Sequence, residues 1–168
     1  MKITIQRILT RGEYVHGRLS IDGNRICDTL ENSLSMVPSG SYDIALLKCK
    51  QYSRKMPCLK AASKREKSQA CLSYSEREQA RPQVNPSAPC LQCPKLRLVC
   101  TNSTMPCYCP QIKPGNGVHN RLDGSILVGR YNCLGSLIHP KTTFDPLYER
   151  IRKAISRGTV ITLIIKDE

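Results

Sequence analysis

The 168-residue sequence predicts a β-rich α+β fold: an antiparallel sheet, curled or barrel-like, with one C-terminal helix and a cysteine-rich insertion. Three observations indicate this architecture. Apolar residues alternate with polar ones in the first fifty residues, as in half-buried strands. One segment near the C-terminus has helical spacing instead. Seven of the ten cysteines lie between residues 53 and 109, in a stretch of different composition.

The N-terminal third is predicted to be an antiparallel meander. Ile3, Ile5 and Ile8 supply the apolar side chains of a first strand, as expected for a strand with one buried face. Asp22-Gly23-Asn24 is a strong hairpin signal, because these residue types tolerate the positive φ of tight turns. The further strands expected here are residues 14–21, 25–30 and, after a turn at Pro38-Ser39-Gly40, 42–49.

The C-terminal third combines strands with a helix. A short strand is expected at 125–128, and apolar residues with helical spacing then follow Thr142-Thr143. Pro146 is expected in the first turn of this helix, and Gly158 is expected to end it. Residues 159–166 form a last strand that is apolar on both faces, so we expect it to be central. The apolar helix positions are Phe144, Leu147, Ile151 and Ile155.

The formal net charge of +13 favours polyanionic partners: nucleic acid, an acidic cell-wall polymer or an anionic membrane surface. The alternative is a solvated basic surface. Met1 to Arg7 alternates like a strand and lacks the apolar core of a secretory leader. The apolar run from Val160 to Ile165 is too short to span a bilayer. We therefore expect a chain that is soluble and cytoplasmic at synthesis.

Residues 60–109 are predicted to be a basic, cysteine-rich insertion in a core domain made of residues 1–59 and 110–168. Residues 53–109 hold ten Lys and Arg against three Asp and Glu. Prolines are frequent, and only residues 95–100 have strand character. A loop of this length without secondary structure is uncommon within a compact domain. Either something other than an apolar core orders the insertion, or it is disordered.

The spacing of the cysteines makes zinc one candidate. Cys90-x-x-Cys93 and Cys107-x-Cys109 could place four thiolates around one tetrahedral ion, with Cys100 as a substitute ligand. Disulfides are the alternative if the protein reaches an oxidising compartment. A largely disordered insertion with reduced thiols is the third possibility.

A glycine-rich loop leads into the strand at 125–128, between Gly115 and Gly129. With the motifs around it, the chain resembles a family of small uncharacterised domains from bacteria and their phages. The family motif, Ile-His-x-Gly-Asn followed by Gly-Cys-Ile-Leu-Val-Gly, is in turn similar to the His and Cys arrangement of L,D-transpeptidases. The other matching segments are Ile21-Asp22-Gly23, Cys27-Asp28-Thr29-Leu30-Glu31, Pro38-Ser39-Gly40-Ser41-Tyr42 and Tyr52-Ser53-Arg54-Lys55-Met56-Pro57.

This chain departs from the family motif at its two reactive positions. Lys113 stands where the family has His, and Ser125 stands where it has Cys. A serine is a much weaker nucleophile than a thiolate unless a base is hydrogen-bonded to it. His119 or Lys113 is the candidate base in this sequence. The resemblance thus implies a transpeptidase-like scaffold with its chemistry reduced or lost.

The function we expect is that of a non-catalytic accessory or binding domain, with the cell wall as a candidate partner. One alternative is a peptidoglycan-active acyl-transfer or hydrolytic enzyme that uses Ser125 with His119 or Lys113. A second is a zinc-dependent nucleic-acid-binding module that acts through the insertion. His16 and His139 have no spaced partner in the sequence, so both are interpreted as structural or exposed.

Overall fold

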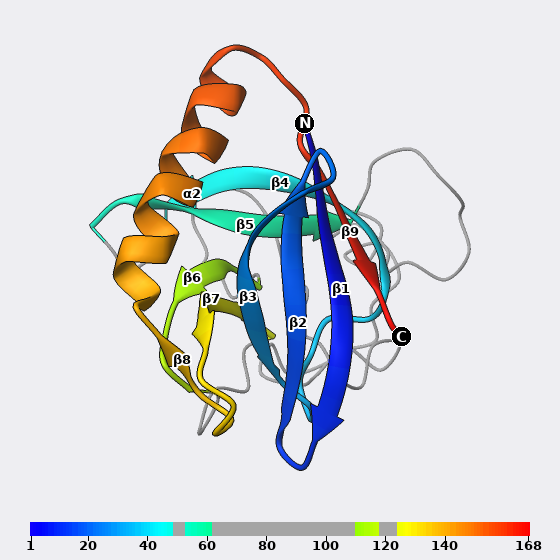
Figure 1. Ribbon diagram of the computed structural model, residues 1–168. Coiled ribbons are helices and arrows are strands. Elements are labelled where there is room, and N and C mark those ends of the chain that lie inside the picture. The colour runs from blue at the N-terminus through cyan, green and yellow to red at the C-terminus, as the bar shows by residue number, and fades with distance from the viewer. Residues whose placement is uncertain (49–52, 62–109, 118–123) are drawn as a thin grey trace, which may run out of the picture.

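The computed structural model of the chain describes residues 1–48, 53–61, 110–117 and 124–168. In this part, nine strands form one sheet in the order β5-β4-β9-β1-β2-β3-β7-β6, with β8 paired to β7 (Figure 1). The strands are β1 (Lys2–Arg11), β2 (Tyr14–Ile21), β3 (Asn24–Asn32), β4 (Gly40–Lys48), β5 (Lys55–Ala61), β6 (Ile112–Pro114), β7 (Ile126–Tyr131), β8 (Leu137–Ile138) and β9 (Thr162–Lys166).

The sheet curls until its two ends almost meet. Cys58 of β5 forms an isolated antiparallel bridge with Gln111, directly before β6. The backbone N–H of Leu59 also donates to the carbonyl oxygen of Pro110 at 2.9 Å. These contacts link the first and last strands of the sheet order and nearly close a barrel. The predicted β-rich, barrel-like fold is therefore confirmed.

The predicted hairpin between the second and third strands is confirmed. β2 ends at Ile21 and β3 begins at Asn24, so Asp22 and Gly23 form a two-residue loop. Both have positive φ, 50° and 88°, as in the turn type that matches the twist of paired strands. The Asp22 carboxylate also accepts the backbone N–H of Lys2 at 2.9 Å, which ties the loop to the start of β1.

β9 is central, as predicted, and lies between β4 and β1. It pairs with β1 in parallel, and β6 pairs with β7 in parallel, so the sheet is mixed rather than purely antiparallel. The strand begins at Thr162 instead of residue 159, and it is not buried equally on both faces. Leu163 and Ile165 are fully buried, whereas Ile164 is half-buried.

Helix α2 (Pro140–Ser156) packs beside β6, β7 and β4 and covers one side of the barrel (Figure 1). It begins at Pro140, before the Thr142-Thr143 pair that was expected to precede its apolar positions. A proline is tolerated there, because its missing N–H would have no intrahelical partner in the first turn. Pro146 consequently lies inside the helix and not in its first turn. Gly158, with φ of 73°, follows the last turn as predicted. Among the described helices, none has the length and apolar character needed to cross a membrane.

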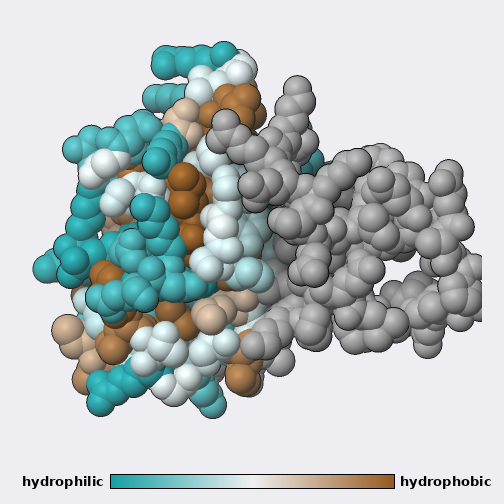
Figure 2. All heavy atoms as spheres, turned by 90° about the vertical axis from the view of Figure 1, so that its right-hand side faces the viewer, coloured by the Kyte–Doolittle hydropathy of each residue, from teal (hydrophilic) through white to brown (hydrophobic). Residues whose placement is uncertain are grey.

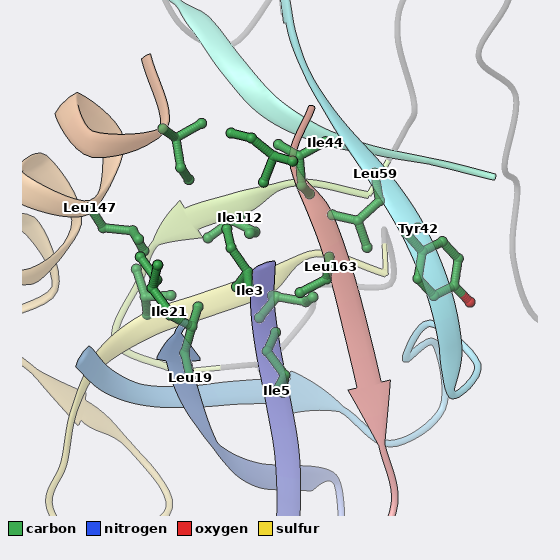
Figure 3. Packing of buried hydrophobic residues seen from close by; sticks show 14 of the residues in the cluster. Ile3, Ile5, Leu19, Ile21, Tyr42, Ile44, Leu59, Ile112, Leu147 and Leu163 are labelled. Carbon is green, nitrogen blue, oxygen red and sulfur yellow. The ribbon is translucent and has the colours of Figure 1, made fainter. Parts of the chain in front are cut away.

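The apolar core fills the barrel and extends to the inner face of α2 (Figure 3). Ile3 and Ile5 of β1 and Leu163 of β9 are fully buried in it. Ile8, expected to be a third core residue of the first strand, is only half-buried. Arg7 takes the next inward position after Ile5, and the pairing of β1 with β2 shifts by a bulge between Arg7 and Leu9. On the described surface seen in Figure 2, hydrophilic and hydrophobic residues are interspersed.

Candidate functional site

The structure brings Ser125 and Lys113 onto adjoining segments of the sheet. Lys113 of β6 lies opposite Leu127 of β7, and Ser125 directly precedes β7. The Ser125 hydroxyl oxygen accepts the backbone N–H of Gln111 at 3.3 Å. The backbone N–H of Ile126 donates to the carbonyl oxygen of Gln111 at 2.8 Å. Ser125 thus takes part in the pairing that starts the β6–β7 ladder.

Both side chains are buried: Ser125 is 7% exposed and Lys113 1%. The glycines around them have identifiable roles. A Cβ added to Gly115 would meet the Leu127 side chain at 2.8 Å, and Gly124, just before Ser125, has φ of 69°. His119, the other candidate base, lies outside the described residues.

The predicted metal ligands Cys90, Cys93, Cys107 and Cys109, and the substitute Cys100, also lie outside the described residues. Among the described cysteines, Cys27 and Cys58 are buried and Cys133 is exposed. Burial, helped by the neighbouring Asp28 carboxylate, raises the pKa of Cys27 to about 12, so this side chain is a neutral thiol. In the described part of the chain, no three His, Cys, Asp or Glu residues gather as a metal site would require.

A polar cluster on the outer face of β2, β3 and β7 was not predicted. We call Asp28, Arg25, His16 and Tyr131 the outer cluster. One carboxylate oxygen of Asp28 accepts a hydrogen bond from the Arg25 guanidinium at 2.8 Å. The other accepts one from the backbone N–H of Tyr131 at 3.0 Å. The His16 ring stacks on the Tyr131 ring with centroids 4.0 Å apart, and its Nε2 lies 3.5 Å from Asp28.

The hydrogen bonds decide the charge of Asp28. Burial alone would raise the pKa of this carboxyl group. The N–H of Tyr131, the Arg25 guanidinium and the His16 ring together outweigh burial, so the Asp28 pKa is lowered. Asp28 is therefore a stable anion on the outer face.

Arg7 and Glu31 are buried on the inner face of the sheet, and with the exposed Asp167 they form a second unpredicted group, which we call the inner cluster. Arg7 binds Glu31 through two hydrogen bonds, of 3.1 and 2.7 Å, and also donates to the carbonyl oxygen of Val37. Its other terminal nitrogen binds Asp167 at 2.8 Å. Glu31 is 0% exposed, and burial raises its pKa although Arg7 acts in the opposite direction.

These clusters could be found in the sequence only in part. Arg7 continues the inward alternation of Ile3 and Ile5, which is a signal for a charged residue at a core position. His16 was assigned to a strand correctly, but its partners come from β3 and β7 and have no fixed spacing from it. No protein-family model, curated protein or solved structure matches this chain.

Proposed function

We propose that the chain is a non-catalytic binding domain of a bacterial or phage family, on a scaffold that resembles L,D-transpeptidases. In this proposal, Lys113 and Ser125 occupy the positions of the family's His and Cys. The observation that carries it is the setting of Ser125, whose buried hydroxyl accepts a backbone N–H of the neighbouring segment.

Acyl transfer makes demands that this setting does not favour. A nucleophile must approach the substrate carbonyl to about 3 Å, in a site that the substrate can enter. Its proton must pass to a base within hydrogen-bond reach. Ser125 is 7% exposed and Lys113 1%, so a peptide would have to displace packed structure to reach either of them. The Ser125 hydroxyl is better suited to joining β6 to β7.

We propose peptidoglycan as the partner, because its peptide stems carry carboxylates and the chain carries a net charge of +13. Helix α2 offers a surface for this interaction. Arg150 and Lys153 are exposed and spaced at i and i+3, which places them on one side of the helix, and the exposed Arg157 directly follows its last residue.

The test is co-sedimentation with purified peptidoglycan sacculi, beside incubation with muropeptides followed by mass spectrometry. The triple variant Arg150→Gln, Lys153→Gln, Arg157→Gln should lower sacculus affinity by at least about tenfold. A matched control removes three exposed charges elsewhere: Arg18→Gln, Lys48→Gln, Lys55→Gln. This control should bind nearly as well as the unmodified protein.

Two results would overturn the proposal. Muropeptide turnover that disappears in Ser125→Ala would establish the enzyme alternative. Failure of the unmodified protein to bind sacculi would remove the proposed partner. The zinc-dependent nucleic-acid alternative concerns Cys90, Cys93, Cys107 and Cys109, and metal analysis of protein purified without chelator tests it separately.

A further inference from the structure

The most exposed large apolar side chains of the described surface include Leu134, at 87%, and Leu34, at 72%. Leu34 lies between β3 and β4, and Leu134 lies between β7 and β8. The β1–β2 turn and the β7–β8 turn lie at the same end of the barrel, the lower end in Figure 1. We call this end, with residues 33–35 and 132–136 and the β1–β2 turn, the loop tip.

The same local structure holds both leucines. The Asn32 side-chain oxygen accepts the backbone N–H of Leu34 at 2.9 Å, and the Asn132 oxygen accepts that of Leu134 at 3.0 Å. Each is an Asn-x-Leu turn in which the asparagine satisfies the backbone that a loop leaves unpaired. Asn132 also binds the Ser136 hydroxyl at 2.7 Å. The leucines are thus presented by ordered turns.

Both turns are anchored to the β1–β2 turn or to Tyr14, the first residue of β2. The backbone N–H of Ser33 donates to the carbonyl oxygen of Glu13, and its hydroxyl donates to the carbonyl oxygen of Gly12, each at 2.9 Å. On the other side, Gly135 packs so closely on Tyr14 that an added Cβ would lie 2.6 Å from the ring. The two leucines therefore flank the β1–β2 turn as parts of one surface.

Aromatic and basic residues at the ends of β1, β2 and β7 border the loop tip. The hydroxyl groups of Tyr14 and Tyr131 are 3.1 Å apart. Arg11 is exposed and close enough to Tyr131 for their charges to interact, and Arg130, the residue before Tyr131 in β7, is also exposed. Glu13 is the one acidic residue among the described residues of this surface. This arrangement matches the boundary between lipid tails and headgroups. There, leucines can enter the apolar region, tyrosines can lie at the interface and arginines can contact anionic headgroups.

We propose that the loop tip docks on a lipid bilayer that carries anionic headgroups. Leu34 and Leu134 insert among the acyl chains, and Arg11 and Arg130 lie at the headgroups. Two separate turns that each present one leucine suit a fluid apolar phase, which needs no matching pocket. The net charge of +13 supplies the second attraction that a small apolar insertion requires. This proposal does not depend on peptidoglycan binding.

The experiment is co-sedimentation of the full chain with vesicles of phosphatidylcholine alone, or of phosphatidylcholine with phosphatidylglycerol. The unmodified protein should bind the anionic vesicles, and less so at high salt. Each of Leu34→Ser and Leu134→Ser should lower the partition coefficient by about tenfold. Val160→Ser is the matched control, since Val160 is also 72% exposed but lies between α2 and β9, away from the loop tip. It should change binding by less than about twofold.

Three results would overturn the proposal. The unmodified protein could fail to bind anionic vesicles, or the double variant Leu34→Ser, Leu134→Ser could bind as well as Val160→Ser. Sedimentation without lipid could instead show a self-associated protein that the double variant dissociates, which would make the loop tip a contact between copies. Sacculus binding should be equal in the double variant and the unmodified protein.

Discussion

Asp28 and Glu31 stand three residues apart on β3 and face opposite sides of the sheet. Asp28, in the outer cluster, has a lowered pKa, whereas Glu31, in the inner cluster, has a raised one. Both carboxylates bind an arginine, with closest distances of 2.8 Å for Arg25 and 2.7 Å for Arg7. An arginine partner alone therefore does not determine the direction of the shift.

The degree of burial accounts for the difference, since each carboxylate accepts two hydrogen bonds. Asp28 has Arg25, the Tyr131 N–H and His16 around it, and the Arg25 side chain is 57% exposed. The Glu31 side chain is 1% exposed, so loss of hydration outweighs the attraction of Arg7. A buried ion pair of this kind depends on both partners being present.

The largest expected effect is that of removing one partner of the inner cluster. Arg7→Met leaves Glu31 buried without its guanidinium and should lower the free energy of unfolding by about 3–5 kcal/mol. Urea unfolding at neutral pH measures this. The double variant Arg7→Met, Glu31→Met should recover most of the loss, because no buried charge then remains. A double variant as unstable as Arg7→Met would contradict the explanation.

The two carboxylates should give opposite pH dependences. The stability that Asp28 contributes is present above its ordinary pKa of 3.8 and is lost as pH falls through its lowered folded value. Ionisation of Glu31 instead costs stability as pH rises above its ordinary pKa of 4.5 toward its raised folded value. At pH 7, the free energy of unfolding of the unmodified protein should exceed that of Asp28→Asn by about 1.5 kcal/mol. This difference should decrease as the pH is lowered to 3.

As the pH is lowered from 7 to 3, the free energy of unfolding of the unmodified protein should increase relative to that of Glu31→Gln. Urea unfolding at a series of pH values measures both trends, with Glu168→Gln, an exposed change, as the control. If both stability differences changed with pH in the same direction, the pKa values of Asp28 and Glu31 would not be shifted in opposite directions.

The smallest expected effect is at the exposed side of the outer cluster. Arg25→Ala should cost about 0.5 kcal/mol, because exposed ion pairs are screened by solvent and salt. Thermal unfolding in low and high salt measures this, and the difference should decrease in high salt. A loss as large as that in Arg7→Met would place Arg25 among the structural residues of the core.

Much of the fold could be predicted because it depends on local patterns. The Asp22-Gly23 hairpin follows from residues that accept positive φ, and the apolar face of α2 follows from the spacing of Phe144, Leu147 and Ile151. The helix begins at Pro140, before the Thr142-Thr143 pair that the apolar spacing follows, because a proline fits the first turn. For the candidate site, the sequence could place Lys113 and Ser125 beside a glycine-rich loop but could not predict their burial.

The sequence by itself determined β1 to β4, β7, β9, the hairpin, the helix and the central position of β9, because alternation, turn chemistry and helical spacing act between near neighbours. It did not predict β5, β6 or β8, which are held by pairing with β4 and β7. The expectation that only residues 95–100 have strand character between 53 and 109 was wrong, since Lys55–Ala61 form β5. Only the tertiary structure decided that Arg7 meets Glu31 and Asp167, and that His16 meets Asp28 and Tyr131. Those partners are 12 to 160 residues apart, and sheet register brings them together. The same register buries Ser125, whose residue type alone would have allowed a reactive group.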